Sequence, residues 1–252
     1  MSAGRSLLLM VALLMASPAL AQAPAKAPAP TPAQAPAKAP PPTPAPAPSG
    51  PMYIIAYFET APAMANGTAR ALHRFEATTR KETGNEGVAA LRESRRPGRF
   101  AIVETWRDKT ALDAGQKGLE TLSASLQTRL IAPFDIRPCV ALDVAGTAPN
   151  SEGAGRRALY VLTHVDVIPT YKDEAIGLVK GLLAAGRQDH GNLIFDAVQQ
   201  GNRPNHMFLV EAWEARGAFN EYVASAPART FREKLLPLQG ALYDERLYEA
   251  IR

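Results

Sequence analysis

The chain repeats itself with a shift of 107 residues, and this internal duplication limits its possible folds more than any other feature. The positions that coincide without a gap are Tyr53 and Tyr160, Pro62 and Pro169, Arg80 and Arg187, Gly84-Asn85 and Gly191-Asn192, Arg96-Pro97 and Arg203-Pro204, and Val103-Glu104-x-Trp106 and Val210-Glu211-x-Trp213. Most of these residues suit turns and strand ends, so a shared apolar composition does not explain the match. The sequence therefore predicts two copies of one domain, at 52–145 and 158–252, with an inter-domain linker at 146–157.

Each copy reads in the order strand, helix, two strands, helix, strand. In the first copy the strands are expected at 53–59, 87–94, 99–107 and 134–143, with one helix that stops at Gly84 and another at 109–131. In the second copy they are expected at 159–167, 193–200, 206–214 and 241–248, with one helix that stops at Gly191 and another at 215–236. The Arg-Pro turns join the two middle strands as a hairpin. This order is that of the ferredoxin-like βαββαβ fold.

A sheet of this kind carries helices on one face only, so its other face needs a cover. The linker is rich in Gly, Ala, Ser and Asn and is long enough for the two sheets to meet face to face. We therefore predict an α+β protein in which two ferredoxin-like βαββαβ repeats form an intramolecular, pseudo-dimeric α+β barrel. A monomer is expected, because the second copy supplies the face that a single-domain protein takes from its twin. Further self-association through the final strands stays open.

The first 51 residues indicate export. Arg5 precedes an apolar run from Leu7 to Met15, and Ala19-Leu20-Ala21 is a small-x-small cleavage pattern, which predicts a signal peptide at 1–21 and a periplasmic or secreted protein. The run is too short for a membrane span, although a retained anchor is the alternative. Residues 22–51 contain twelve Pro and ten Ala, which is typical of a semi-rigid linker or, alternatively, of a tail without a task.

Charge and cysteine usage exclude several classes of protein. Arg5, Lys26 and Lys38 carry three of the four net positive charges, so the rest of the chain is near neutral and has no basic stripe for nucleic acid. The single cysteine, Cys139, cannot form an internal disulfide, and its apolar neighbours favour burial. No two histidines have the spacing of zinc ligands, and no glycine-rich phosphate loop is present, so neither a metal nor a cofactor is expected.

One strand pattern resembles a known family. The segment Phe100–Asp108, which contains Val103-Glu104-Thr105-Trp106 and is followed by Ala111-Leu112, and its copy at Met207–Trp213 are similar to the antibiotic-biosynthesis-monooxygenase domains of the dimeric α+β-barrel superfamily. The resemblance covers about 53–143 and 158–248. It implies cofactor-free monooxygenases of quinols and polyketides, or a branch that degrades haem. Many members carry a His in the helix after the Trp, but 112–117 and 219–224 contain none, which counts against haem.

The candidate site residues follow from this pattern. A period of two places Glu104 and Trp106 on one face of their strand, and the same holds for Glu211 and Trp213. In the family the Trp commonly borders the ligand cavity, where its ring can stack on an aromatic substrate while a carboxylate accepts a proton. The alternative is a core Trp with a satisfied indole N–H, and a strand-end Glu that binds a neighbouring Arg or backbone amide or is simply solvated.

Histidine offers one further candidate. His164 lies in mid-strand, where the other copy has Tyr57, so either side chain could point into a pocket; a hydrogen-bonded core His is the alternative. The remaining histidines are expected on the surface, and they are His73, His190 and His206.

Three functions remain open. The first is an exported, cofactor-independent monooxygenase of a quinol-like or aromatic polyketide-like small molecule. In it Trp106, Trp213 and Tyr57 would line the cavity, and Glu104, Glu211 or His164 would assist deprotonation. The second is a periplasmic small-molecule binding module without catalysis. The third is a structural or partner-binding envelope protein. Because Gly115 stands where the second copy has Tyr222, two equal sites are not expected.

Overall fold

Both faces are largely buried in the first three strands of each copy, which explains why these strands are nearly continuous apolar runs, whereas the final strand of each copy is more exposed. The computed structural model describes residues 50–146, 148–150, 155 and 157–252, which belong to one unit, Ala45–Arg252. The first copy comprises β1 (Met52–Thr60), α1 (Ala65–Thr79), β2 (Asn85–Glu93), β3 (Arg99–Trp106), α2 (Lys109–Leu126) and β4 (Leu130–Asp143). The second comprises β5 (Leu159–Asp166), α3 (Lys172–Gly186), β6 (Asn192–Gln200), β7 (His206–Trp213), α4 (Arg216–Val223), α5 (Ala226–Leu235) and β8 (Asp244–Ala250). Short 3-10 turns lie at Pro62–Met64, Gln127–Arg129, Pro169–Tyr171 and Leu236–Leu238.

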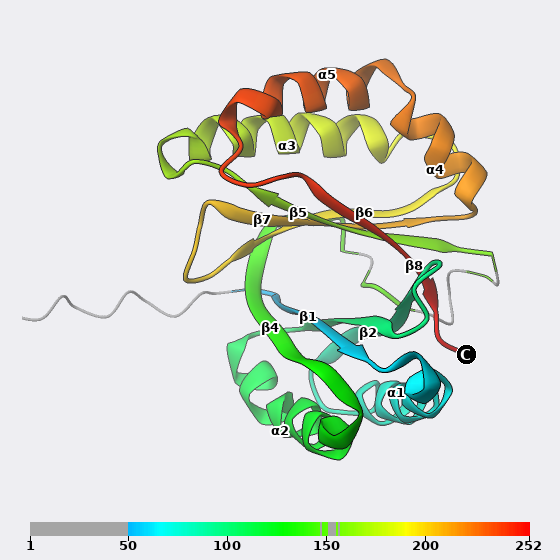
Figure 1. The fold of residues 1–252 in the computed structure, drawn as a ribbon. Coiled ribbons are helices and arrows are strands. Elements are labelled where there is room, and N and C mark those ends of the chain that lie inside the picture. Colours follow the sequence, from blue (N-terminus) through cyan, green and yellow to red (C-terminus); the bar gives the residue numbers. More distant parts are fainter. Residues whose placement is uncertain (1–49, 147, 151–154, 156) are drawn as a thin grey trace, which may run out of the picture. The chain divides into compact units, whose positions relative to one another are not determined.

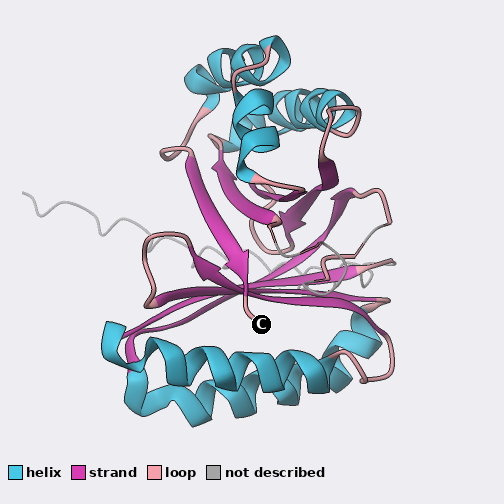
Figure 2. Cartoon of the chain, turned by 90° about the vertical axis from the view of Figure 1, so that its right-hand side faces the viewer, coloured by secondary structure: helices cyan, strands magenta, loops and turns pink. Residues whose placement is uncertain are grey.

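The eight strands close into one antiparallel barrel in the order β1-β3-β2-β8-β5-β7-β6-β4. The final strand of each copy makes the closure, because β4 pairs with β1 and then with β6, and β8 pairs with β5 and then with β2. Figures 1 and 2 show the helices of the two copies on opposite outer sides of the paired sheets. The predicted pseudo-dimeric α+β barrel of two ferredoxin-like repeats is confirmed.

Three apolar clusters follow from this arrangement. The barrel interior contains side chains of both copies, among them Ile55, Leu91, Leu162 and Val210. A second cluster lies between the first sheet and α1 and α2, and a third between the second sheet and α3, α4 and α5. Cys139 belongs to the interior cluster and is fully buried, as predicted.

The first helix of each copy ends earlier than the sequence indicates. Helix α1 ends at Thr79 and α3 at Gly186, and a short turn leads from each to Gly84 or Gly191. Gly84 has a φ of +85°, and a Cβ there would lie 2.5 Å from the side chain of Ala111. The glycine is therefore required by the turn and by its contact with α2, and it does not end the helix.

The helix expected at 215–236 is two helices, so that prediction is wrong. Helix α4 ends at Val223, and α5 begins at Ala226 after Ser225, whose hydroxyl accepts a hydrogen bond from the Ala228 N–H. Pro227 stands in the first turn of α5, where its missing N–H has no cost, whereas it would break a continuous helix. The final strand of this copy begins at Asp244 because the Gly240 N–H bonds the Asp166 carbonyl and holds the preceding residues in a turn.

No helix in the described part of the chain is long and apolar enough to cross a membrane. The predicted signal peptide and nearly all of the Pro/Ala-rich linker lie outside the described residues.

Candidate functional site

Each copy carries a hydrogen-bonded glutamate–tryptophan pair beneath its helices. The Trp106 indole N–H donates to Glu104 Oε2 at 2.8 Å, and the Trp213 indole N–H donates to Glu211 Oε2 at 3.0 Å. Both tryptophans are fully buried, and both glutamates are 2% exposed. The two residues of each pair share a strand face as predicted. The alternative of a core Trp with a satisfied indole N–H describes both tryptophans, but its solvated glutamate is wrong, because the helices after β3 and β7 cover the strand ends.

Burial perturbs both carboxyl groups. Burial, helped by the negative charge of Glu82, raises the pKa of Glu104 to about 7. The hydrogen bond from the Trp106 indole acts in the opposite direction and lowers this pKa. Burial likewise raises the pKa of Glu211 to about 8. Within the described residues, Glu104 Oε1 is buried without a hydrogen-bond partner, which disfavours the charged form. Glu104 is therefore a carboxyl group that can exchange a proton near neutral pH.

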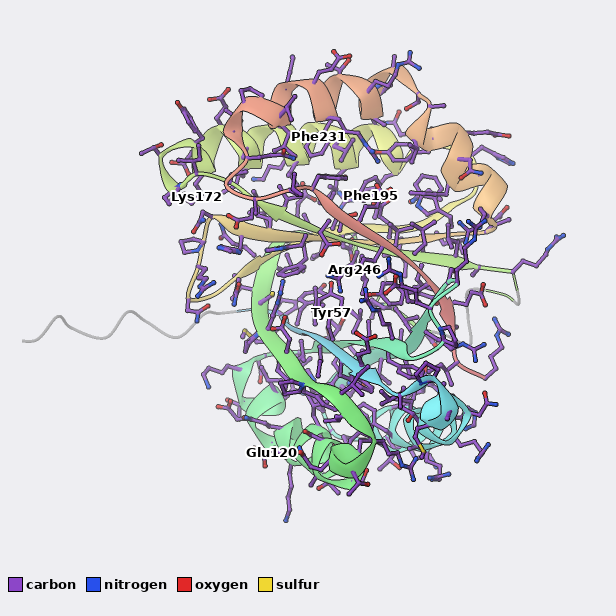
Figure 3. All side chains as sticks on the ribbon, viewed as in Figure 1. Tyr57, Glu120, Lys172, Phe195, Phe231 and Arg246 are labelled. Atoms are coloured by element: carbon purple, nitrogen blue, oxygen red, sulfur yellow. The ribbon has the colours of Figure 1, made fainter. Side chains whose placement is uncertain are left out.

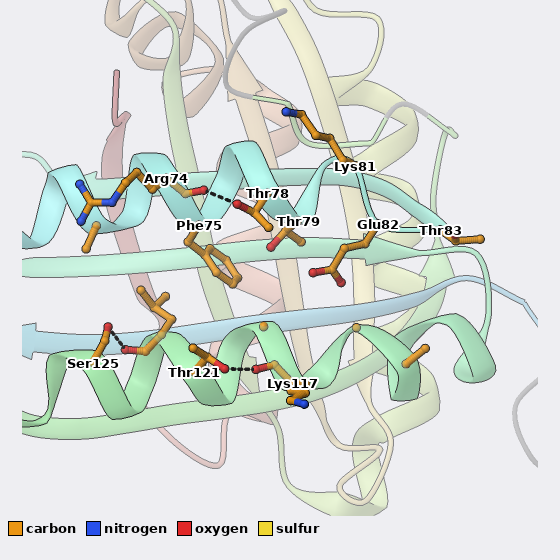
Figure 4. Close-up of a pocket in the computed structure, with 15 residues that line it drawn as sticks. Arg74, Phe75, Thr78, Thr79, Lys81, Glu82, Thr83, Lys117, Thr121 and Ser125 are labelled. Carbon is orange, nitrogen blue, oxygen red and sulfur yellow. Dashed lines mark hydrogen bonds between the residues drawn. The ribbon is translucent and has the colours of Figure 1, made fainter.

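The first copy has a groove of about 780 Å³ between α1 and α2. Figure 4 shows the two helices side by side, with Phe75, Thr79 and Glu82 directed into the space between them. The hydroxyls of Thr78, Thr121 and Ser125 bond backbone carbonyls of their own helices. They are thus satisfied without a ligand, and the Glu82 carboxylate is the acidic group of the groove lining.

Gly115 separates this groove from Trp106. A Cβ at Gly115 would lie 2.0 Å from the Trp106 ring, so only glycine allows α2 to rest on the indole. Gly118, one turn further along α2, faces Glu82, whose Oε1 would lie 3.3 Å from a Cβ there. Trp106 lies under the groove and does not line it directly.

The second copy fills the corresponding space with aromatic rings. Tyr222, which stands in the place of Gly115, stacks on Trp213 with ring centroids 4.8 Å apart, and Phe195 contacts both rings edge to face. The cavity that remains beside Glu211 is about 10 Å³, barely the space of one water. In Figure 3, Phe195 and Phe231 lie between this sheet and its helices. Within the described residues, the pocket beside the pair of the second copy is therefore nearly filled, whereas an open groove lies above the pair of the first copy.

Glu82 is a site residue that the sequence analysis missed. It follows the end of α1, lines the groove, and has a pKa raised by burial. One signal could have found it: an acidic residue stands two positions before Gly-Asn in both copies, Glu82 in the first and Asp189 in the second.

Tyr57 and His164 lie elsewhere, inside the barrel on the opposite sheet faces from the glutamates. Nε2 of His164 is 3.0 Å from Nδ1 of His206, so one ring donates to the other. Burial, helped by the charge of Arg137, lowers the pKa of His164 to about 4. His206 is partly buried in this pair, so its predicted surface position is wrong. The six predicted site residues thus do not form one site.

Two arginines surround Tyr57 from the final strands of both copies. The guanidinium carbons of Arg137 and Arg246 lie 5.5 and 5.2 Å from the centre of its ring, and Figure 3 places Tyr57 and Arg246 between the two sheets. Asp135 and Asp244 pair with these arginines at 2.6 Å. The cation–π contact of Arg246 with Tyr57 therefore links the two copies, where Tyr57 was expected to bind substrate and His164 to assist deprotonation.

Among the described residues, no three His, Cys, Asp or Glu side chains are gathered as metal ligands.

Glu104 makes a testable contribution to the pH dependence of stability. Its folded pKa lies above the ordinary 4.5, so the native state retains a proton that the unfolded chain loses between about pH 4.5 and 7, and stability falls as the pH rises through this window. Glu104→Gln keeps an acceptor for the indole and abolishes the titration. We expect it to gain on the order of 1–3 kcal/mol relative to wild type between pH 5 and 8 in urea unfolding. The exposed Glu120→Gln is the control, and an equal response of both variants would contradict the assignment.

Comparisons with known proteins agree with this architecture. A Fusobacterium nucleatum protein described as a "putative monooxygenase" superposes with a TM-score of 0.70 at 15% identity, covering 81% of this chain and 94% of that chain. A Lactobacillus acidophilus protein of the same description gives 0.65 at 12% identity, with coverages of 81% and 95%. An anthrone oxidase-like protein gives 0.56 at 15% identity, with coverages of 81% and 92%. At these identities the likeness establishes the fold.

A search of curated proteins found no match to this chain. The sequence model of one family, described as antibiotic biosynthesis monooxygenase, matches residues 51–119 and 158–234, once in each copy and together more than half of the chain. The chain belongs to the antibiotic biosynthesis monooxygenase family.

Proposed function

We propose that this chain is a cofactor-independent monooxygenase with one working site, the groove between α1 and α2 of the first copy. Its substrate is a flat phenolic or quinol-like aromatic compound with an acidic C–H or O–H bond. The observation that carries the proposal is the contrast between the copies. The same glutamate–tryptophan pair lies under an open groove of about 780 Å³ in one and under packed aromatic rings in the other.

The chemistry requires a base, because triplet oxygen reacts slowly with neutral closed-shell molecules and faster with a carbanion or phenolate. Glu82 is the carboxylate that lines the groove, and its raised pKa makes it a better proton acceptor than an ordinary glutamate. Glu104 lies below, close enough for the charges of the two groups to interact. We assign Glu82 as the base. Glu104 is a buried carboxyl group whose charge, when it is ionised, interacts with that of Glu82.

The overall reaction balances without an external reductant. When one O₂ converts a CH₂ carbon to a carbonyl, one oxygen atom enters the C=O bond and the other leaves as water. The substrate supplies all four electrons. Arg74, Lys81 and Lys117 also line the groove, and their positive charges would stabilise the anion formed by deprotonation.

Binding without catalysis is the second candidate function. It is favoured by the exposure of several lining residues, including Thr78, Lys117 and Thr121, since a reactive carbanion is better protected in a site that excludes water. A purely structural role fits less well, because the groove is not filled by side chains. His164 and Tyr57 have no part in the proposed chemistry, and Glu211 lies in the filled copy.

Oxygen uptake with anthrone, measured above its autoxidation rate, tests the proposal. Gly118→Leu should abolish uptake, because it fills the groove while improving helix propensity, whereas Gly181→Leu, at an open position on α3, should leave uptake unchanged.

The role of Glu82 as the base is tested in the same assay. Glu82→Gln should lower kcat by about 10²–10⁴ fold, whereas Asp189→Asn in the second copy should leave kcat unchanged. Absence of uptake by the wild-type protein, with anthrone still bound, would reject catalysis in favour of binding.

We further propose that the protein is exported and that cleavage follows Ala21, on the basis of the N-terminal sequence. N-terminal sequencing of the protein purified from its native host should therefore begin at Gln22. An uncleaved N-terminus would refute this assignment.

A further inference from the structure

A second pocket of about 520 Å³ lies on the outer side of α1, and its lining is strongly basic. We name it the arginine pocket. Its residues are Asn66, Ala69, Arg70, His73, Arg74, Arg92 and Arg252. Four of the seven are arginines, and none is acidic. Such a concentration of one charge is unusual in a folded unit that is close to neutral as a whole.

Three elements of the fold build the arginine pocket. Arg70, His73 and Arg74 follow one another at helical spacing on the exposed side of α1. Arg92 is contributed by the end of β2, and Arg252 follows β8, which pairs with β2 at this point. The pocket therefore contains residues from the beginning and the end of the described unit, brought together by barrel closure.

These cations are not neutralised by acidic side chains. In the described part of the chain Arg70, Arg74 and Arg92 take part in no ion pair of 4.0 Å or less. Glu249 lies opposite Arg92 in the strand register, and its carboxylate accepts a hydrogen bond from the Ser94 hydroxyl at 3.5 Å.

A fifth guanidinium adds to the positive charge beside the pocket. The Nη1 atom of Arg129 would lie 3.2 Å from a Cβ at Gly67, and Nη2 of Arg70 would lie 3.9 Å from the same point. Two arginines thus converge over a glycine that leaves them room. Neighbouring like charges repel, and an oxyanion held between them would remove that repulsion.

The second copy shows that the fold does not require these residues. In the repeat register Arg70 is replaced by Gly177, Arg74 by Gly181 and Arg92 by Gln199. The same register places Asp173 opposite Asn66. Arg70, Arg74 and Arg92 are therefore a feature of the first copy, the one that also has the open groove.

We propose that the arginine pocket binds a phosphate or diphosphate group. Guanidinium groups match the oxygen geometry of phosphate with paired N–H donors, and several of them suit a multiply charged anion better than a single carboxylate. Arg74 lines both the arginine pocket and the groove, so a phosphorylated ligand held here would place its organic part next to the groove. The binding site stands independently of the proposed oxygenation, because it requires no turnover.

Isothermal titration of the purified protein with inorganic pyrophosphate, at an ionic strength of about 150 mM, tests the proposal. The double variant Arg70→Gln/Arg92→Gln should raise the Kd at least about tenfold, since both side chains would contact the anion. The control Lys180→Gln/Arg216→Gln removes the same charge from exposed positions of the second copy and should change the Kd by less than about twofold. Thermal unfolding verifies that both variants are folded.

A second arm identifies the source of the phosphate. Cosedimentation with phosphatidylglycerol/phosphatidylcholine vesicles reports a lipid headgroup, while pyrophosphate reports a soluble phosphorylated compound. A loss specific to Arg70→Gln/Arg92→Gln in either arm supports the site and names its source. Equal losses in the two double variants, or no binding in either arm, would overturn it.

Discussion

The structure depends on one apolar sheet face that neither copy can cover alone. Ile55 and Leu91 of the first copy and Leu162 and Val210 of the second are at most 1% exposed inside the barrel. Burying an aliphatic side chain of this size contributes about 1.5–3 kcal/mol, so separating the sheets would remove a large part of the stability of the fold. Pairing of β4 with β6 and of β8 with β2 closes the barrel and satisfies the strand edges.

Once the two copies are held in one barrel, the space under their helices is free to diverge. Each copy retains a buried carboxyl group hydrogen-bonded to an indole. At Gly115 helix α2 rests on Trp106 beneath an open groove, whereas in the other copy Tyr222 stacks on Trp213. The positive charge differs between the copies as well, since three arginines of the arginine pocket belong to the copy with the groove and are replaced by uncharged residues in the other copy. We infer that the second copy maintains the barrel and the first interacts with ligands.

The sequence was a good guide to the barrel and a partial guide to the site. The shift of 107 residues predicts two copies, and a period of two correctly places Glu104 beside Trp106. Burial of Glu104 was not predictable, because it depends on how closely α2 approaches the sheet at Gly115. The contact between His164 and His206 comes from the register of β5 and β7, in which Asp166 is opposite His206. Local sequence patterns carry no information about such contacts.

Single-tryptophan fluorescence tests the central claim, that the first copy alone has a working site, most directly. Trp213→Phe leaves Trp106 beneath the groove, and Trp106→Phe leaves Trp213 beneath Tyr222. Titration of both variants with an anthrone-like phenol should quench the emission of Trp106 and leave that of Trp213 unchanged. Equal quenching in both variants, or quenching of Trp213 alone, would contradict the assignment of the site to the first copy.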